Sequence, residues 1–293
     1  MLRELLDDLR HHDSVLWRRA AAAGIAYGPD AFVRYSPPLF GLAFAAALPR
    51  QRRAVRDNLR RALGLRDPVR EARDVAMVFA NYASSLTDAF IAGSARGDSL
   101  RVRCLDEPTL ARVQAEGNGI ILATAHTGGW QVAGLGFERL LGGKMLVVMR
   151  RERDPRAQAL QETARERAGV RFAYVGDEPL SSLGLLGHLR RGGVLAIQID
   201  RLPPGMRGLP ATLFGAPFSL PEGPLRLAAV SGAPIVPVFT RRLGYMEYDV
   251  HVAQPVRLPR RPSPADLEAA SSAILRAMEA FVVANPTQWF HFE

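Results

Sequence analysis

Apolar positions change their spacing about a third of the way along the chain. Up to about residue 95 they recur every three to four residues, which is the spacing of amphipathic helices. From residue 119 onwards, short apolar runs alternate with amphipathic stretches, which is typical of strands separated by helices. The pattern therefore predicts an α/β fold: a mostly parallel central sheet flanked by helices, with an N-terminal helical region. We divide the chain into a helical region at 1–97 and an α/β domain at 98–293.

The predicted strands are short apolar runs at 119–125, 145–149, 170–175, 194–199, 235–239 and 247–252. Helices are predicted near 130–141, 155–168, 180–191 and 223–231, with a final helix at about 264–284. Residues 202–221 are rich in Pro and Gly, which predicts a loop.

The N-terminal region places an apolar segment next to a cluster of positive charge. Residues 37–48 (PPLFGLAFAAAL) are uncharged, but a helix needs about 20 apolar residues to span a bilayer. Nine arginines and three acids fall between Arg50 and Arg73, so this stretch holds two thirds of the net charge of +9. One interpretation is an interfacial anchor on anionic lipid. The other is an apolar helix packed on the main domain, followed by a solvated arginine face.

Composition excludes several classes of protein. Apolar residues at 48% and charged residues at 23% exclude a disordered chain, and the single Cys104 excludes a disulfide framework or a cysteine zinc cluster. We expect no metal. The basic pI, near 10.6, is compatible with nucleic acid, an anionic membrane or a phosphorylated substrate. The arginine-rich stretch contains no aromatic residue, and no nucleic-acid motif is present, so a nucleic-acid partner is not expected.

The strongest candidate for chemistry follows the first predicted strand, in GIILATAHTGGWQVAG at 119–134. His126 falls where the apolar run stops, and ligands of open α/β sheets bind at the carboxyl ends of strands. An imidazole there can take a proton from an attacking hydroxyl or amine. Gly128 and Gly129 would let substrate approach the backbone, and Trp130 begins a helix whose free N–H groups suit an anion. On position alone, a histidine without a chemical role is an equal alternative.

His126-Thr-Gly-Gly-Trp-Gln131 resembles the His-x4-Asp/Glu box of the lysophospholipid acyltransferase superfamily. It is closest to the bacterial lipid A biosynthesis acyltransferases of lauroyl or myristoyl type, whose box is roughly HFGNWE. Further matches follow in the family's order along the chain: Asn58-Leu59, Met149–Pro155, Leu189–Asp200, Phe214–Pro217, Gly223–Pro237 and Pro286–Phe290 (PTQWF).

The resemblance implies that His126 removes a proton from an acceptor hydroxyl, which then attacks an acyl thioester on acyl carrier protein or coenzyme A. Gln131 occupies the position of the family's acidic residue, and Arg201 follows Asp200 where the family has Gln. An amide can orient the imidazole but cannot neutralise the imidazolium, and the comparable change in a serine-protease triad costs about 10⁴ in turnover. We therefore keep three interpretations open: a slow enzyme, an enzyme with another carboxylate in position, and a protein that has lost the chemistry.

Other candidates are weighed in the same way. The resemblance assigns Arg150 to a phosphate or the acyl donor, while Arg153 is either a substrate ligand or solvated surface. Asp200 could orient a site group or simply open a loop. Glu222-Gly223 is similar to a phosphate-binding EGT box, but Ser219-x-x-Glu222 also predicts a capping box, which we favour. The isolated His188, His251 and His291 are expected to be structural or exposed.

The sequence thus predicts an acyltransferase that is peripheral on the cytoplasmic face of a bacterial inner membrane. Its partners would be an acyl carrier protein or coenzyme A thioester, a lipid-like acceptor with a hydroxyl or amine, and an anionic membrane surface. It would need no cofactor beyond the thioester co-substrate. The alternative is a non-catalytic or strongly attenuated lipid- or carrier-binding protein on the same scaffold, an interpretation that rests on Gln131.

Overall fold

The computed structural model describes residues 23–25, 27–92, 99–132, 134, 141–149, 158, 171–175 and 181–293. Its N-terminal part is helical, as predicted, with α3 (Asp30–Tyr35), α4 (Pro37–Ala47), α5 (Pro49–Leu63) and α6 (Pro68–Ala92). The predicted boundary between residues 97 and 98 falls at the edge of 93–98, outside the described residues.

Strands and helices alternate after residue 100. The strands are β1 (Arg101–Cys104), β2 (Ile120–Thr124), β3 (Met145–Met149), β4 (Arg171–Tyr174), β5 (Val194–Gln198), β6 (Gly208–Leu213), β7 (Ala216–Pro221), β8 (Ile235–Gly244) and β9 (Glu247–Val252). The helices are α7 (Glu107–Ala115), α10 (Ser181–Arg190), α11 (Gly223–Ser231), α12 (Pro264–Ala284) and the 3₁₀ turn η2 (Pro286–Gln288).

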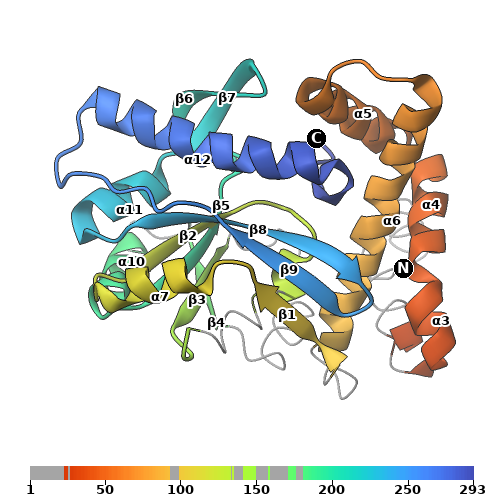
Figure 1. Ribbon diagram of the computed structural model, residues 1–293, viewed down its shortest axis with the longest axis horizontal. Helices are drawn as coiled ribbons and strands as arrows, with labels where there is room; N and C mark the ends of the chain where they lie inside the picture. The colour runs from red at the N-terminus through yellow and green to blue at the C-terminus, as the bar shows by residue number, and fades with distance from the viewer. Residues whose placement is uncertain are drawn as a thin grey trace, which may run out of the picture.

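Seven strands form the central sheet, in the order β1-β9-β8-β2-β5-β3-β4. The strands from β8 to β4 are parallel, while β9 runs antiparallel to β8 and β1 runs parallel to β9. Figure 1 shows α12 lying across one side of this sheet and the N-terminal helices standing beside its β8–β9 end. The predicted α/β class, with a mostly parallel sheet and an N-terminal helical region, is confirmed.

The central strands are apolar throughout because both faces of the sheet are covered. Every residue of β2 is buried. Ile121 and Ala123 face the core that α10, α11 and α12 complete, whereas Ile120 and Leu122 face the core that contains α7. Burial on both faces removes the polar alternation of a half-exposed strand, so a parallel central strand has a continuous apolar sequence.

The prediction of a loop over 202–221 was wrong. This stretch contains β6 and β7, which pair antiparallel around a turn at Phe214-Gly215 and form a separate two-stranded ribbon. Proline is tolerated there because a two-stranded ribbon consists of edges, where a missing N–H does not interrupt a ladder. Sequence analysis also missed β1 and α7, which are short.

Helix α6 joins the N-terminal region to the sheet. Its Asp88 is buried and accepts hydrogen bonds from Arg242 Nε (2.8 Å), the Tyr248 hydroxyl (2.6 Å) and the Met246 backbone N–H (3.2 Å). These partners come from β8, β9 and the turn between them. A buried charge is stable only when it is paired in this way, so the network fixes α6 against the end of the β8–β9 hairpin.

Candidate active site

His126 lies just beyond the carboxyl end of β2, at the start of a tight turn. The Thr127 N–H donates to the Ala125 carbonyl (2.7 Å), and the Gly129 N–H donates to the Thr127 carbonyl (2.7 Å). The turn ends the strand immediately after its buried residues and leaves a quarter of the His126 side chain exposed. An imidazole anchored on a central strand but open to solvent is well placed to meet a substrate.

A buried carboxylate, Asp200, holds His126. Strand β5 lies parallel to β2, with Thr124 opposite Gln198, so the same register extended by two residues brings Asp200 opposite His126. Oδ1 of Asp200 is 2.8 Å from Nδ1 of His126, and its Oδ2 accepts the backbone N–H of His126 at 3.1 Å. One carboxylate therefore fixes both the ring and the backbone of this histidine.

The C-terminal segment completes the surroundings of Asp200. Trp289 pairs with Thr127 in an antiparallel bridge, and its buried indole N–H donates to Asp200 Oδ2 at 3.2 Å. The Phe290 N–H donates to the His126 carbonyl at 2.7 Å. Nδ1 of His291 lies 4.0 Å from the same Oδ2, close to Asp200 but beyond hydrogen-bond distance. The C-terminal segment thus binds both members of the pair, the backbone of His126 and the carboxylate of Asp200.

The environment of Asp200 keeps it ionised. Burial alone would raise the pKa of this carboxyl, but the imidazoles of His126 and His291 and the charge of Arg201 hold the pKa well below its usual value. An ionised carboxylate can only accept hydrogen bonds, so Nδ1 of His126 carries the proton that lies between them. In the neutral imidazole, Nε2 is then the nitrogen without a proton.

Gln131 is not the partner of His126. Among the described residues, no hydrogen bond joins the two side chains, and Asp200 occupies the Nδ1 position that an orienting group would need. The neighbouring Trp130 instead packs edge-on to the His126 ring, with centroids 6.1 Å apart. Of the interpretations left open by the sequence, the one with another carboxylate in position agrees with this geometry.

The two glycines after His126 are packed against the sheet. A Cβ on Gly128, whose φ is +54°, would lie 2.1 Å from the Thr240 carbonyl oxygen, and one on Gly129 would lie 2.3 Å from the Tyr248 ring. The Gly128 N–H already donates to the Gln288 carbonyl at 2.8 Å. Close packing thus requires glycine at both positions, and substrate contact with them stays a prediction.

The remaining predicted site residues do not join this cluster. Arg150 and Arg153 lie outside the described residues. Glu222 precedes α11 without capping it through its side chain, which accepts instead from Arg226 Nε at 2.6 Å. The capping box was wrong because Ser219 lies in β7, paired with Pro210. Gly223 begins α11, and no hydrogen bond or ion pair of the described residues connects Glu222 or Gly223 with His126 or Asp200.

Sequence reasoning missed Trp289 and the position of His291. The PTQWF segment was matched to the family's C-terminal pattern without a role, and His291 was expected to be structural or exposed. The sequence feature that could have pointed to them is the run of aromatic residues in and after the matched PTQWF segment. Within the described residues, no group of three or more His, Cys, Asp or Glu side chains could hold a metal.

Together these contacts define a class of protein: an α/β protein with a histidine–carboxylate pair at the carboxyl edge of its sheet. The family of bacterial lipid A biosynthesis acyltransferases matches residues 16–293, and the chain belongs to this family. Membership makes acyl transfer to a lipid-like acceptor its general activity and an acyl thioester its general kind of donor, in a membrane-associated family. No curated protein matches the chain.

Proposed function

We propose that the chain transfers a fatty acyl group from a thioester to a hydroxyl or amine of a lipid-like acceptor, with His126 as general base. The observation that carries the proposal is the 2.8 Å contact between His126 Nδ1 and Asp200 Oδ1. It leaves Nε2 unprotonated and keeps a negative charge beside the ring. This is the electrostatic arrangement that favours formation of an imidazolium.

In the proposed reaction, His126 carries the transferred proton and Asp200 carries the compensating negative charge. Nε2 of His126 takes the proton of the acceptor hydroxyl while the hydroxyl oxygen attacks the thioester carbonyl carbon. Asp200 stabilises the resulting imidazolium. The carbon–sulfur bond then breaks, and the leaving thiolate takes the proton from Nε2, which restores the neutral histidine. Acyl carrier protein and coenzyme A thioesters both meet these requirements, and a phosphate on either donor remains the proposed ligand of Arg150 and Arg153.

The test is thiol release from an acyl thioester in the presence and absence of a lipid acceptor. His126→Ala should abolish acceptor-dependent release, and Asp200→Asn should reduce it by about 10⁴, as in a serine-protease triad. Glu268→Gln makes a similar carboxylate-to-amide change on the exposed face of α12 and should leave the rate unchanged. Full activity of Asp200→Asn would refute the role of the pair. The non-catalytic alternative predicts no single-turnover transfer even by the unmodified chain.

We further propose that α3 and α4 bind an anionic membrane peripherally, on the side where thioester donors are made. Support comes from an outward face of Phe32, Tyr35, Leu39, Phe40 and Leu42, all exposed. Helix α4 contains no charged residue, and its opposite face packs on α6 so closely that a Cβ on Gly41 would lie 2.4 Å from the Phe79 carbonyl oxygen. An apolar face followed at once by the arginines of α5 suits an anionic bilayer surface.

Among the described helices, α6 alone is long and apolar enough to span a bilayer. Its burial and its charged residues suit a helix of the protein core better than a membrane span. Its most apolar window is 44% buried within the protein, and the helix carries the paired, buried Glu71 and Asp88. Membrane attachment is therefore assigned to α3–α4 and tested by flotation with phosphatidylglycerol vesicles. Leu39→Ser/Phe40→Ser should abolish flotation, whereas Leu65→Ser, a change at a more exposed leucine just after α5, should not. Unchanged flotation of the double variant would contradict this assignment.

A further inference from the structure

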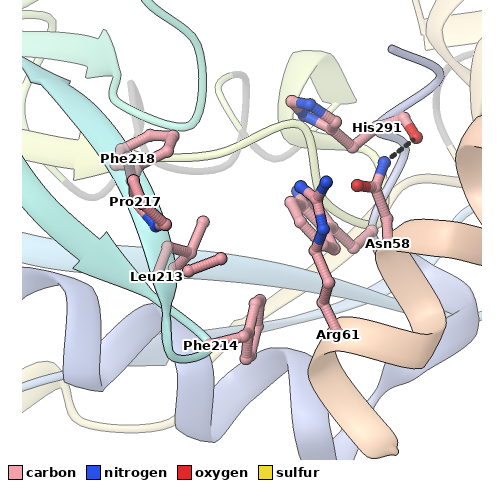
Figure 2. A pocket seen from close by; sticks show the side chains of 9 residues that line it. Asn58, Arg61, Leu213, Phe214, Pro217, Phe218 and His291 are labelled. Atoms are coloured by element: carbon pink, nitrogen blue, oxygen red, sulfur yellow. Dashed lines mark hydrogen bonds between the residues drawn. The ribbon is translucent and has the colours of Figure 1, made fainter. Parts of the chain in front are cut away.

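A pocket lies between α5 and the β6–β7 ribbon, beside the C-terminal segment that contacts Asp200. Figure 2 shows Arg61 and Asn58 of α5 facing Leu213, Phe214, Pro217 and Phe218 of the ribbon across this space. Trp289 and His291 also line it, and these are the residues that approach Asp200 from the C-terminal segment. The pocket comprises about 340 Å³ of space, its side open to solvent included.

The two walls of the pocket differ in chemistry. The ribbon contributes an apolar wall. The α5 wall contributes Arg61, which has no hydrogen bond or ion pair within the described part of the chain. Its neighbours on the helix differ: Arg56 and Arg60 both pair with Glu71. A guanidinium kept free beside an apolar surface suits a ligand that is anionic at one point and apolar next to it.

No carboxylate of the described residues forms an ion pair with Arg61: Asp57, one turn earlier on α5, is not paired with it, and the two other acids near the pocket are engaged elsewhere. Glu293 pairs with Arg201 at 3.2 Å, and Asp200 is fully buried against His126 and Trp289. The Asn58 amide donates to the His291 and Glu293 carbonyls, at 3.0 and 3.1 Å, so it holds the C-terminal segment against α5. The positive charge at the mouth of this pocket is therefore available to an external anion.

Phe214 gives a second, independent indication of a ligand. It has a φ of +51° in a two-residue hairpin turn with Gly215 (φ +72°), where Asn-Gly is strongly preferred and a bulky side chain is strained. Its ring packs on Trp289 with centroids 5.7 Å apart, and it lines the pocket. Backbone strain that is retained at one residue is typical of functional sites. The strained residue here, Phe214, lies between the pocket and Trp289, which contacts Asp200.

We propose that this pocket receives the phosphate-bearing head group of the lipid acceptor, with the phosphate on Arg61 and the adjoining carbons against Phe214 and Phe218. This inference rests on the proposed function and specifies its acceptor as an anionic lipid. The location agrees with it, because α5, the helix that carries Arg61, follows the apolar helix α4 directly in the chain. The head group would be held next to Trp289 and His291, the two residues that approach Asp200 from the C-terminal segment.

Binding is measured by titrating the full chain, without any thioester, with two soluble probes: dihexanoyl phosphatidic acid and the uncharged dihexanoylglycerol. The wild-type chain should bind the phosphate-bearing probe more tightly. Arg61→Gln should weaken that binding about tenfold, the usual worth of one hydrogen bond to a charged group, and leave the uncharged probe unaffected. Phe218→Ala should weaken both probes. Arg260→Gln is the control: it makes the same charge change at an exposed arginine just before α12 begins, away from the pocket lining, and it should affect neither probe.

Several results would overturn the proposal. They are equal binding of the two probes by the wild-type chain, equal losses in Arg61→Gln and Arg260→Gln, or a rise in the KM of the thioester donor alone when Arg61→Gln is assayed for transfer. Equal thermal unfolding of wild type and Arg61→Gln shows that the fold is intact. Because the titration needs no turnover, phosphate-selective binding without transfer would refute only the catalytic proposal, and transfer without such selectivity would refute only the pocket.

Discussion

The carboxylate that serves His126 comes from a different strand, seventy-four residues further along the chain. Although the His-x4-Gln box ends in glutamine, the imidazole has a carboxylate partner across the sheet, in Asp200, two residues beyond the end of the adjacent parallel strand β5. The short-range motif and the long-range pair are therefore alternative ways to place one negative charge beside one ring. In this chain the long-range pair is present.

Gln131→Glu tests this account at the level of a single residue. Because Asp200 already binds Nδ1, a second carboxylate cannot take the orienting position at that nitrogen. We expect kcat/KM to change by less than about threefold, below the tenfold worth of a charge-assisted hydrogen bond. Acceptor-dependent thiol release measures it. A gain of a hundredfold or more would mean that the natural chain lacks a working carboxylate.

Trp289→Phe isolates the indole N–H, since the aromatic ring is retained. Losing this donor leaves Asp200 Oδ2 with one hydrogen bond fewer and increases its attraction for a protonated His126. We expect kcat/KM to fall about tenfold. Acceptor-dependent thiol release measures it, and an unchanged rate would show that Trp289 only fills space.

At the scale of elements, the site depends on how the end of β2 is held. The turn after His126 lies between β8, whose Thr240 N–H donates to Thr127 Oγ1 at 3.1 Å, and α6, whose Ser85 hydroxyl donates to the Gly128 carbonyl. The C-terminal segment closes the third side through the Thr127–Trp289 bridge. Three elements distant in sequence thus determine the position of the His126 side chain.

Gly128→Ala should disrupt this arrangement far more than an equivalent change elsewhere. Gly117 also has a positive φ (+77°), but a Cβ there has open space, so Gly117→Ala costs only the backbone term of about 1–2 kcal/mol. At Gly128 the clash with the Thr240 carbonyl adds to that term. We expect a loss of more than about 3 kcal/mol in the free energy of unfolding and a loss of activity. Urea denaturation of the two variants compares them, and equal losses would contradict the packing argument.

At the scale of the whole molecule, the buried polar groups that join the parts also make stability depend on pH. His251 packs edge-on against Phe281 of α12, with its Nε2 buried and without a partner. Burial and the positive charge of Arg241 lower the pKa of this histidine below its usual value. In the unfolded chain the same histidine takes up a proton near its ordinary pKa of about 6.5.

The sign of the effect follows from that difference. As pH falls below about 6.5, the unfolded state binds the proton first, so the contribution of His251 to stability is present at pH 7.5 and is lost towards pH 5.5. We expect the free energy of unfolding to decrease over this range, and to decrease less in His251→Gln. Urea denaturation at the two pH values gives the comparison, and a slope unchanged by His251→Gln would contradict it.

The sequence by itself determined the local features of this protein. Apolar runs located the six predicted strands of the main sheet because strands buried on both faces must be apolar, and helical spacing located α10, α11 and α12 because each buries one stripe. The break after such a run placed His126 at a strand end. Pro and Gly hid the β6–β7 ribbon, since an isolated ribbon tolerates residues that a central strand excludes.

Only the tertiary structure decided which groups meet. Strand order and register brought Asp200 opposite His126, and neither is encoded in the spacing of nearby residues. The C-terminal segment placed Trp289 and His291 at the same carboxylate, and α5 brought Arg61 opposite the ribbon. The physical reason is that periodicity depends on neighbours within a few residues, whereas a catalytic pair depends on contacts between strands distant in sequence, which form only when the sheet is assembled.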